Sequence, residues 1–339
     1  MKVWLTLDMN LELADVPAQA RRAEALGCDV VTVADVAHDA LLGAHAAIAA
    51  TSRVGVATSG LVCFARSPMV TAVGTWNLAA LSGGRFRLGL SSLVPQMLVG
   101  KYAVPWHPPA ARMREYLGAL GAIWNSWQHD VPLHFEGAYY RLNRQNWWTR
   151  PKPLPDARIP VHLGAIGPLM STLAGASADG LLTHPAATTV RYLEEVTRAR
   201  IHQGERSAGR PPGSVALIAA PVCATGNSDA EVRAQREQRR EMLAINLSTP
   251  HYWGALELHG NKATGEKLRA LVRANRWDLL AAEIDDELLD TLVPAATWDR
   301  LASELRRRFD GLVDGLCLPL PVEDRDDARL ARLIRALRE

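Results

Sequence analysis

The chain has 339 residues, of which 48% are hydrophobic and 22% are charged, and its formal net charge at pH 7 is +2. This length permits two domains or one barrel-sized domain, and the composition is that of a globular protein with a large core. Because nucleic-acid-binding proteins concentrate basic residues in a patch or stripe, the balanced charge argues against a nucleic-acid partner.

Short apolar runs rich in β-branched residues alternate with longer helical patterns, and one such pair recurs roughly every 30 residues. We predict strands over residues 3–8, 29–35, 54–63, 85–90, 159–165, 179–184, 214–224 and 311–321. We predict helices over residues 13–27, 40–52, 68–81, 109–127, 168–176, 188–203 and 229–246, followed by more helix to about residue 310. Apolar strands separated by helices require a parallel sheet that is buried on both faces. Eight such units fit an α/β fold of the (β/α)8 TIM barrel type better than an open doubly wound sheet.

Two insertions interrupt this period. The segment 131–148 contains an expected hairpin after the fourth helix, with Glu136 and Gly137 at its turn. A helical insertion over about 250–297 separates strands seven and eight. Long insertions on a barrel usually cap its active-site face. Since no linker or low-complexity segment marks a boundary, we predict a single domain over residues 1–339.

The four cysteines, Cys28, Cys63, Cys223 and Cys317, lie far apart in the sequence, without the paired spacing of zinc ligands or redox motifs. We therefore expect reduced cysteines that pack as small apolar side chains, and no metal site. The sequence starts directly with MKVWLTLD, and it contains no apolar signal segment and no run of about 18 apolar residues. These features predict a cytoplasmic protein without a membrane partner.

In a TIM barrel the chemistry takes place where the strands end, so the residues just after each strand are the candidates. Asp8 follows the first strand, and Asp35, His38 and Asp39 follow the second. A histidine close to a carboxylate is suited to proton transfer because its pKa lies near neutrality. A surface histidine beside Asp39 as a helix cap explains the same pattern, so both alternatives remain open.

Further candidates follow the third and the sixth strands. Arg66 is suited to pair with a phosphate or a carboxylate, while Ser67 and Pro68 after it fit a helix cap and a first helical position. Thr183 and His184 enter the mouth of the barrel after the sixth strand. A lone histidine at such a place is as often structural as functional, so its role stays open.

The turn after the fifth strand reads GAIGP. Gly164 and Gly167 permit a close backbone approach, and Pro168 at the first helical position leaves the amides of the first turn free. A helix N-terminus of this kind suits an anion such as a cofactor phosphate. The sequence has no GxGxxG after its first strand, no P-loop lysine and no HExxH, which excludes ordinary Rossmann, nucleotide-hydrolysing and zinc-protease functions.

Three segments together carry a family resemblance: RSPMVTAVGTWNLAALSGGRFRLGL (66–90), PPAARMREYLGALGAIW (108–124) and GAIGPLMSTLAGASADGLLTHP (164–185). They resemble the bacterial luciferase-like monooxygenase superfamily, and more narrowly its coenzyme F420-dependent oxidoreductase branch. The resemblance covers nearly the whole chain. It implies a TIM barrel that binds a flavin-type ring, either deazaflavin or FMN, in its C-terminal mouth, where the protein orients the ring and supplies a proton donor or acceptor.

The resemblance also assigns roles to individual residues. A bulge after the third strand would back the ring, and the turn after the fifth strand would hold the phosphate tail. The implied cofactor contacts are Leu61, Cys63, Phe64, Arg66, Gly164, Ala165, Gly167, Pro168, Thr183 and His184. His38 would move the proton, with Asp35 as its acidic neighbour. In many relatives a histidine directly follows the acidic residue, whereas here Val36 stands in that place.

The chain departs from the family pattern after the fourth strand. Many relatives carry polar or charged residues there, whereas this segment reads SSLVPQMLVGKYAVPWHPPA and is mostly apolar. The residues expected around the substrate are Asp8, Ser92, Gln96, Met97 and Trp106. A usual catalytic acid is missing from the segment, so proton transfer would depend on His38.

Three functions follow from these features. The first is hydride transfer between coenzyme F420 and a moderately apolar small molecule. The second is an FMN-dependent monooxygenase that uses a separate flavin reductase. The third is a barrel without redox activity, acting as a cofactor-free catalyst or a binding protein. The resemblance also implies a homodimer that pairs through barrel helices.

Overall fold

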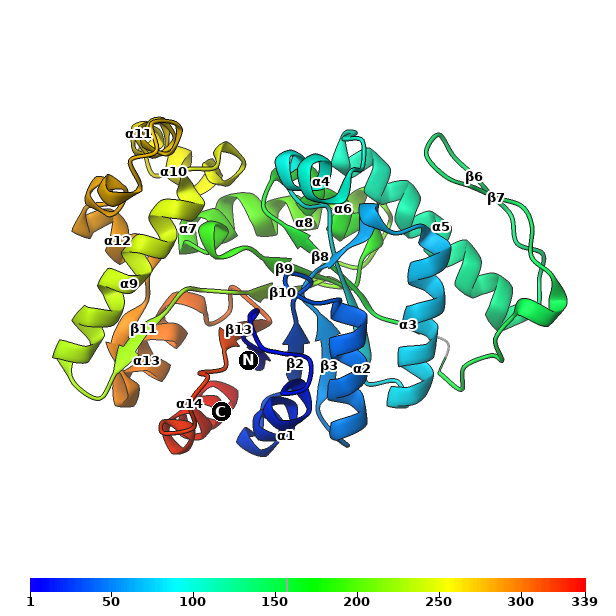
Figure 1. The fold of residues 1–339 in the computed structure, drawn as a ribbon, viewed down its shortest axis with the longest axis horizontal. Helices are drawn as coiled ribbons and strands as arrows, with labels where there is room; N and C mark the ends of the chain where they lie inside the picture. Colours follow the sequence, from blue (N-terminus) through cyan, green and yellow to red (C-terminus); the bar gives the residue numbers. More distant parts are fainter. Residues whose placement is uncertain (157) are drawn as a thin grey trace.

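The computed structural model describes residues 1–156 and 158–339. Eight parallel strands form one closed barrel, because β3 pairs with β2 on one side and with β5 on the other (Figure 1). In spatial order the barrel strands are β1 (Lys2–Thr6), β2 (Val30–Val33), β3 (Gly55–Thr58), β5 (Phe86–Ser91), β8 (Val161–Ala165), β9 (Gly180–Thr183), β10 (Ala216–Ala219) and β13 (Gly315–Pro319). The predicted (β/α)8 TIM barrel is therefore confirmed.

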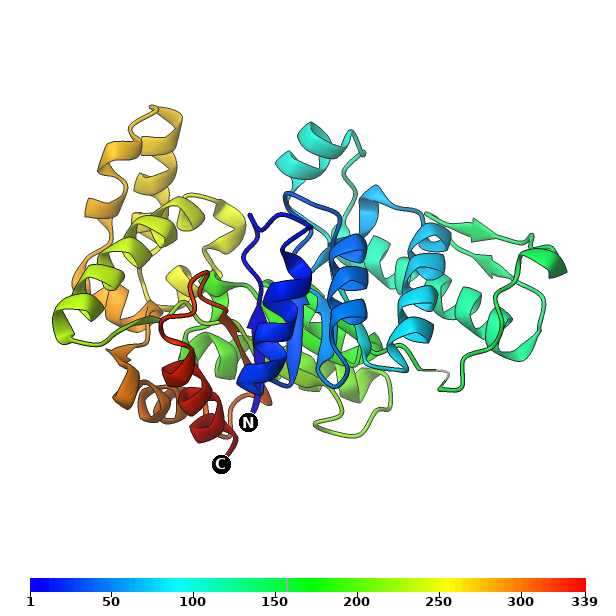
Figure 2. The same ribbon diagram turned by 60° about the horizontal axis from the view of Figure 1, so that its bottom comes forward.

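Helices surround this barrel on its outside (Figures 1 and 2). They are α1 (Val16–Leu26), α2 (Ala40–Ala50), α3 (Pro68–Ser82), α5 (Pro109–His129), α6 (Pro168–Ser177), α7 (Val190–Tyr192), α8 (Ala199–Ser207), α13 (Trp298–Phe309) and α14 (Asp327–Arg338). A further helix, α4 (Pro95–Tyr102), follows β5 and contacts the turn after β4. A π-helical turn, Leu193–Arg198, joins α7 to α8. Gly83 and Gly84 have φ angles of 61° and 84°, a left-handed conformation that lets α3 turn into β5.

Two of these helices are absent from the sequence-based prediction. Helix α4 begins at Pro95, in a segment for which the sequence predicted no helix. Proline is well suited to the first helical position, because its missing N–H has no intrahelical partner there. The C-terminal helix α14 buries Leu330, Leu333, Ile334 and Leu337, spaced as one face of a helix, and Arg22 of α1 pairs with its first residue.

Two predicted strands are each divided in the structure. The third ends at Thr58, and after a cis peptide between Ser59 and Gly60 the chain forms a short strand, β4 (Leu61–Val62). The seventh ends before Pro221, which cannot donate a hydrogen bond to the sheet. The chain then leaves the barrel and forms β11 (Ala224–Gly226), which pairs with β12 (Ala295–Thr297) in a separate sheet.

Aspartates tie neighbouring strands together at the N-terminal end of the barrel. Each aspartate stands immediately before one strand and accepts a backbone N–H group of the neighbouring strand. The three bonds are Val3 N to Asp29 Oδ2 (2.8 Å), Val161 N to Asp179 Oδ2 (2.8 Å) and Leu217 N to Asp314 Oδ2 (2.7 Å). The same carboxylates thus fix the register of three strand pairs away from the mouth.

The two insertions lie at opposite ends of the molecule (Figures 1 and 2). The hairpin of β6 (Phe135–Glu136) and β7 (Arg141–Leu142) packs along α5, where the Glu115 carboxylate accepts the N–H groups of Ala138 and Tyr139. Between β11 and β12 lie α9 (Asp229–Leu247), α10 (Gly254–Leu258), α11 (Lys262–Arg273) and α12 (Asp286–Leu292), which share a hydrophobic core of their own. Across residues 1–156 and 158–339, every helix is too short or too polar to cross a membrane.

Candidate functional site at the barrel mouth

A buried ion pair organises the loops that follow β2 and β3. The Asp35 carboxylate accepts hydrogen bonds from the Arg66 guanidinium (2.8 Å) and from the backbone N–H groups of Val62 (2.9 Å) and Ala40 (3.1 Å). Its side chain is only 5% exposed. Arg66 also pairs with Asp39 at 2.9 Å. Asp35 and Arg66 are therefore both engaged within the chain, and their geometry favours holding the loop over direct contact with a proton or a phosphate.

The charges of this network are mutually stabilised. Burial opposes the charge on Arg66, but its hydrogen bonds with Asp39 and Asp35 still raise the pKa of the guanidinium. Burial likewise opposes ionisation of Asp39, yet the Arg66 side chain and the Leu41 amide lower the pKa of that carboxyl. The ionised Asp39 caps α2 by accepting the Leu41 N–H at 2.8 Å. The helix cap considered from the sequence is thus present.

His38 has a carboxylate partner that sequence reasoning missed. Its Nε2 lies 3.5 Å from Glu12 Oε2, so the pair bridges the loops after β2 and β1. The His38 side chain is 32% exposed, which leaves it open to the mouth. Glu12 stands six residues beyond the end of β1 in an exposed loop, and no sequence spacing links it to His38. A histidine oriented by a carboxylate and open to solvent is suited to proton transfer.

The segment expected to back a flavin-type ring is more deeply buried than the sequence analysis implied. Leu61, Cys63 and Phe64 are all at most 4% exposed. The Cys63 thiol donates to the Ser91 carbonyl at 3.2 Å, and burial raises its pKa, so it stays protonated. Phe64 packs under the Arg112 guanidinium, which lies 4.4 Å from the ring centroid. These three side chains pack into the protein core of the ligand-free chain, so their expected contact with a cofactor stays a prediction.

The partly exposed part of this segment is the preceding pair, Ser59 and Gly60. A Cβ at Gly60 would lie 3.1 Å from the Ser91 side chain, so glycine allows the bulge to sit close against β5. The Ser59–Gly60 backbone is therefore the part of this segment that is open to a ligand. Its position could not be read from the sequence, since the strand pattern runs unbroken from residue 54 to residue 63.

The first turn of α6 has the features of an anion site. Gly167 is the N-cap and Pro168 the first helical residue, and within the described part of the chain no side chain caps this helix. A Cβ at Gly167 would meet nothing within 4 Å, so the space beside the turn is open. Gly164 lets β8 approach β5, because a Cβ there would lie 3.3 Å from the Leu90 carbonyl oxygen. Free amides beside open space fit a phosphate group.

The two residues after β9 make specific contacts with their neighbours. Thr183 Oγ1 accepts the Ala220 N–H at 2.9 Å and so joins β9 to the end of β10. The His184 ring stacks on the Tyr252 ring, with centroids 4.3 Å apart. Burial lowers the pKa of His184 to about 4, so the ring is neutral. Because its Nδ1 accepts the Ala186 N–H, the proton is assigned to Nε2, which is then a donor.

The expected substrate residues lie along α4 and the loops beside it. Gln96 and Met97 are exposed on α4, with Met97 43% exposed, and Ser92 and Trp106 lie before and after this helix. Asp8 is exposed after β1. Lys101 at the end of α4 donates to the Val36 carbonyl at 3.0 Å, which connects α4 to the loop that carries His38.

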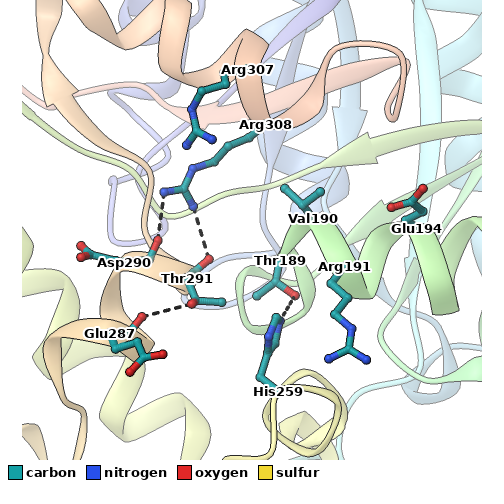
Figure 3. A pocket seen from close by; sticks show the side chains of 10 residues that line it. All are labelled: Thr189, Val190, Arg191, Glu194, His259, Glu287, Asp290, Thr291, Arg307 and Arg308. Atoms are coloured by element: carbon teal, nitrogen blue, oxygen red, sulfur yellow. Dashed lines mark hydrogen bonds between the residues drawn. The ribbon is translucent and has the colours of Figure 1, made fainter.

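A separate groove of about 720 Å³ lies between α7, α12 and α13 (Figure 3). Its arginines are engaged with neighbouring protein groups. Arg308 donates to Glu304 and to the carbonyls of Asp290 and Thr291, and Arg191 pairs with Glu195. Among the described residues that line the groove, none belongs to the predicted site.

A sequence model of the family described as luciferase-like monooxygenase matches residues 3–315. The chain belongs to this family. It is 35% identical over 312 residues to an uncharacterised protein of Mycobacterium tuberculosis, covering 91% of this chain and 92% of the relative. It is 32% identical over 194 residues to an F420-dependent glucose-6-phosphate dehydrogenase of Intrasporangium calvum, covering 52% of this chain and 56% of that enzyme.

Solved structures share the fold over the full length of this luciferase-like enzyme. The coenzyme F420-dependent tetrahydromethanopterin reductase of Methanopyrus kandleri superposes with a TM-score of 0.81 at 18% identity, covering 99% of this chain and 98% of that one. An EDTA monooxygenase of Chelativorans sp. superposes with a TM-score of 0.75 at 17% identity, covering 100% and 93%. Both F420-dependent and monooxygenase members thus have this barrel.

Proposed function

We propose that this enzyme transfers hydride between coenzyme F420 and a moderately apolar small molecule at the C-terminal mouth of the barrel. The observation that carries the proposal is the uncapped first turn of α6, with open space beside Gly167, on the face where His38 meets Glu12. A relative named as F420-dependent supports the choice of cofactor. When bound, the deazaflavin supplies a ring carbon that accepts or releases hydride.

In this proposal the residues of the chain bind, orient and exchange a proton. The α6 amides beside Gly164, Ala165, Gly167 and Pro168 hold the phosphate through the positive end of the helix dipole. His184 donates from Nε2 at the flank of the same site. The following assignments complete the site: Ser59 and Gly60 behind the ring, and Asp8, Ser92, Gln96, Met97 and Trp106 around the substrate.

His38 moves the proton at the substrate oxygen while hydride moves at the adjacent carbon. Glu12 orients its imidazole through their 3.5 Å contact. The buried pair of Asp35 and Arg66 keeps the His38 loop in place. The apolar side chains of Met97 and Trp106, which are 43% and 44% exposed in the ligand-free chain, would cover a bound substrate.

Equilibrium titration of the purified chain with F420 and with FMN, side by side, tests this assignment. We expect saturable F420 binding, followed by spectral reduction or oxidation of the bound deazaflavin with a panel of secondary alcohols and ketones. Tight FMN binding with no F420 binding would defeat the proposal.

The second candidate is an FMN-dependent monooxygenase fed by a separate flavin reductase. The fold shared with a monooxygenase favours it, and the α6 turn suits the FMN phosphate equally well. This candidate requires oxygen consumption by the chain when a reductase supplies reduced FMN. Oxygen uptake under these conditions, together with the titration above, separates the two functions.

We also infer that the enzyme is a homodimer. The neighbouring helices α2 and α3 contain no Asp, Glu, Lys or Arg. Their surfaces leave large apolar side chains exposed: Leu42 (59%), Val70 (58%), Val73 (45%) and Leu81 (61%). A face without charges can pair with its own copy without burying a charge. Light scattering of the wild type and of Leu42→Glu tests this, with a dimer and a monomer expected.

A further inference from the structure

A small hydrophobic cluster lies behind the first turn of α6, separate from the other cores. Ala187, Tyr192 and Ala255 are at most 3% exposed, and partly buried neighbours complete the cluster. Those neighbours are Ile166, Val196 and Leu258. The members come from the loop before α6, the loop after β9, the α7 segment with its π-helical turn, and α10 of the helical insertion. This cluster therefore connects the insertion with the candidate anion site.

Tyr192 makes the polar contact at the centre of this cluster. Its hydroxyl donates to the Ile166 carbonyl at 2.8 Å. Burial raises the pKa of Tyr192, which keeps the hydroxyl protonated as a donor. The Ile166 carbonyl and the Gly167 N–H belong to one planar peptide unit. Fixing the direction of that carbonyl therefore fixes the direction of the Gly167 amide at the N-cap of α6.

Helix α10 also contacts Tyr192. A Cβ at Gly254, the first residue of α10, would lie 2.8 Å from Tyr192 Oη and 3.1 Å from Cε2, so the backbone of α10 is in close contact with the ring. Beyond the last turn of α10, His259 Nε2 lies 3.0 Å from Thr189 Oγ1, which caps α7 (Figure 3). The insertion thus holds the Tyr192 segment at both ends of α10.

The insertion contacts a second loop of the candidate cofactor site. Tyr252, two residues before α10, stacks on His184 with ring planes 21° apart. His184 in turn accepts the Ala186 N–H, beside the buried cluster residue Ala187. One short segment, residues 252–259, therefore contacts both loops that flank the anion site.

We propose that α10 and Tyr192 position the anion-binding turn of α6 before a ligand arrives. The insertion holds Tyr192 against Ile166, and Tyr192 directs the Gly167 amide towards the phosphate of a flavin-type cofactor. In this proposal Tyr192 and Gly254 act through the α6 turn and not on the cofactor itself, so they are positioning residues. The identity of the anion rests on the proposed function, whereas the order of the turn is a property of the ligand-free chain.

The test uses Tyr192→Phe, which removes the hydroxyl and keeps the ring. Tyr116→Phe is the matched control, because it also removes a buried tyrosine hydroxyl, which is bonded to Thr71 Oγ1 at 2.6 Å on α3 and not to the α6 turn. We measure Kd for F420 and for FMN by fluorescence, and hydrogen exchange of residues 166–170 in the ligand-free chain. For Tyr192→Phe we expect a Kd raised by about three- to tenfold, as for the loss of one hydrogen bond, and faster exchange in that segment.

A second pair of variants tests the contribution of α10. Gly254→Ala brings a methyl group against Tyr192 Oη, and we expect it to raise Kd and to speed exchange in the α6 turn. In the Tyr192→Phe background the same change meets no hydroxyl, so its additional effect is expected to be smaller. Such non-additivity is the signature of two residues that act through one contact.

The possible results distinguish a failure of the positioning role from a failure of the proposed function. Unchanged Kd and unchanged exchange in Tyr192→Phe overturn the inference, and so do equal effects in Tyr116→Phe, which would indicate a general loss of packing. A wild type that binds neither F420 nor FMN overturns the proposed function. The exchange measurement on the ligand-free chain still decides whether Tyr192 and Gly254 order the turn.

Discussion

The Arg66 guanidinium and the Asp35 carboxylate lie 2.8 Å apart in a buried pair that joins the loop after β2 to the segment after β4. Because Asp35 also accepts two backbone N–H groups, it cannot leave this position without breaking the start of α2 and the end of the bulge. The pair therefore determines where His38, three residues after Asp35, is held.

Arg66→Met leaves the Asp35 carboxylate buried without its cation. We expect the free energy of unfolding to fall by roughly 3 kcal/mol, as for other buried pairs that lose one partner. Urea denaturation measures this loss. Arg53→Met is the control, because Arg53 is 76% exposed and its pair with Glu24 spans 3.9 Å, so less than about 0.5 kcal/mol is expected. Equal losses in the two variants would contradict a structural role for the buried pair.

His38→Ala removes the proposed proton carrier and leaves the phosphate site intact. We expect kcat to fall by about 100-fold or more with F420 affinity unchanged, because general acid–base catalysis contributes at least that factor. Glu12→Gln keeps the length of the side chain and removes its charge, so a smaller decrease is expected. His134→Ala, at an exposed position before β6, is the matched histidine control. An unchanged kcat in His38→Ala would assign proton transfer to another group.

Gly167→Asp tests the anion site by placing a carboxylate at the N-cap of α6. The new side chain meets open space, and an N-cap aspartate stabilises a helix, so we expect unchanged or higher thermal stability. Its negative charge opposes a phosphate at the same amides, and a cofactor Kd raised by about tenfold or more is expected. Gly167→Asn caps the helix without a charge and should weaken binding less. Equal effects of Asp and Asn would argue against an anionic ligand.

Acid should destabilise the fold through its buried histidines. Burial, and then the charge of Arg87, lowers the pKa of His162 from 6.5 to about 4. Between these two pH values the unfolded chain binds a proton that the native chain does not. The contribution of His162 to the free energy of unfolding is therefore fully present above pH 6.5 and is lost as the pH falls towards 4. Each such histidine contributes a slope of about 1.4 kcal/mol per pH unit in this range.

Unfolding free energies measured by urea between pH 7 and pH 4 check this expectation. His162→Leu lowers the free energy of unfolding at every pH. The slope of this free energy against pH should be smaller than in the wild type, by an amount equivalent to at most one bound proton. The remaining slope includes His184, whose pKa burial also lowers to about 4. A slope identical to that of the wild type would show that His162 is protonated in the native state.

Much of the barrel could be predicted from the sequence, because alternating apolar strands and helices leave a strong periodic pattern. The α6 turn was also predictable, since Gly167 followed by Pro168 is a local signal of a helix start. The partners of the site residues could not be predicted in the same way. Glu12 reaches His38 from another loop, and Tyr252 reaches His184 from the helical insertion, so these pairs exist only after the barrel has closed.

The burial of Leu61, Cys63 and Phe64 was missed for a different reason. The strand pattern continues through residue 63, and nothing in it shows that β3 ends at Thr58 and that a separate short strand, β4, begins at Leu61. Helix α4 was missed because Pro95 is compatible with both a helix start and a helix break. The local sequence at these two places is compatible with more than one backbone path, and contacts with the neighbouring strands determine which path the chain takes.

The aspartates at the N-terminal end of the barrel allow the loops at the other end to change in sequence and length. Asp29, Asp179 and Asp314 hold strand pairs by bonds that do not involve any residue of the mouth. Loops at the opposite end can therefore be lengthened, shortened or exchanged without shifting the strands beneath them. Grafting a relative's loops onto this barrel would be a practical way to give it a new substrate range.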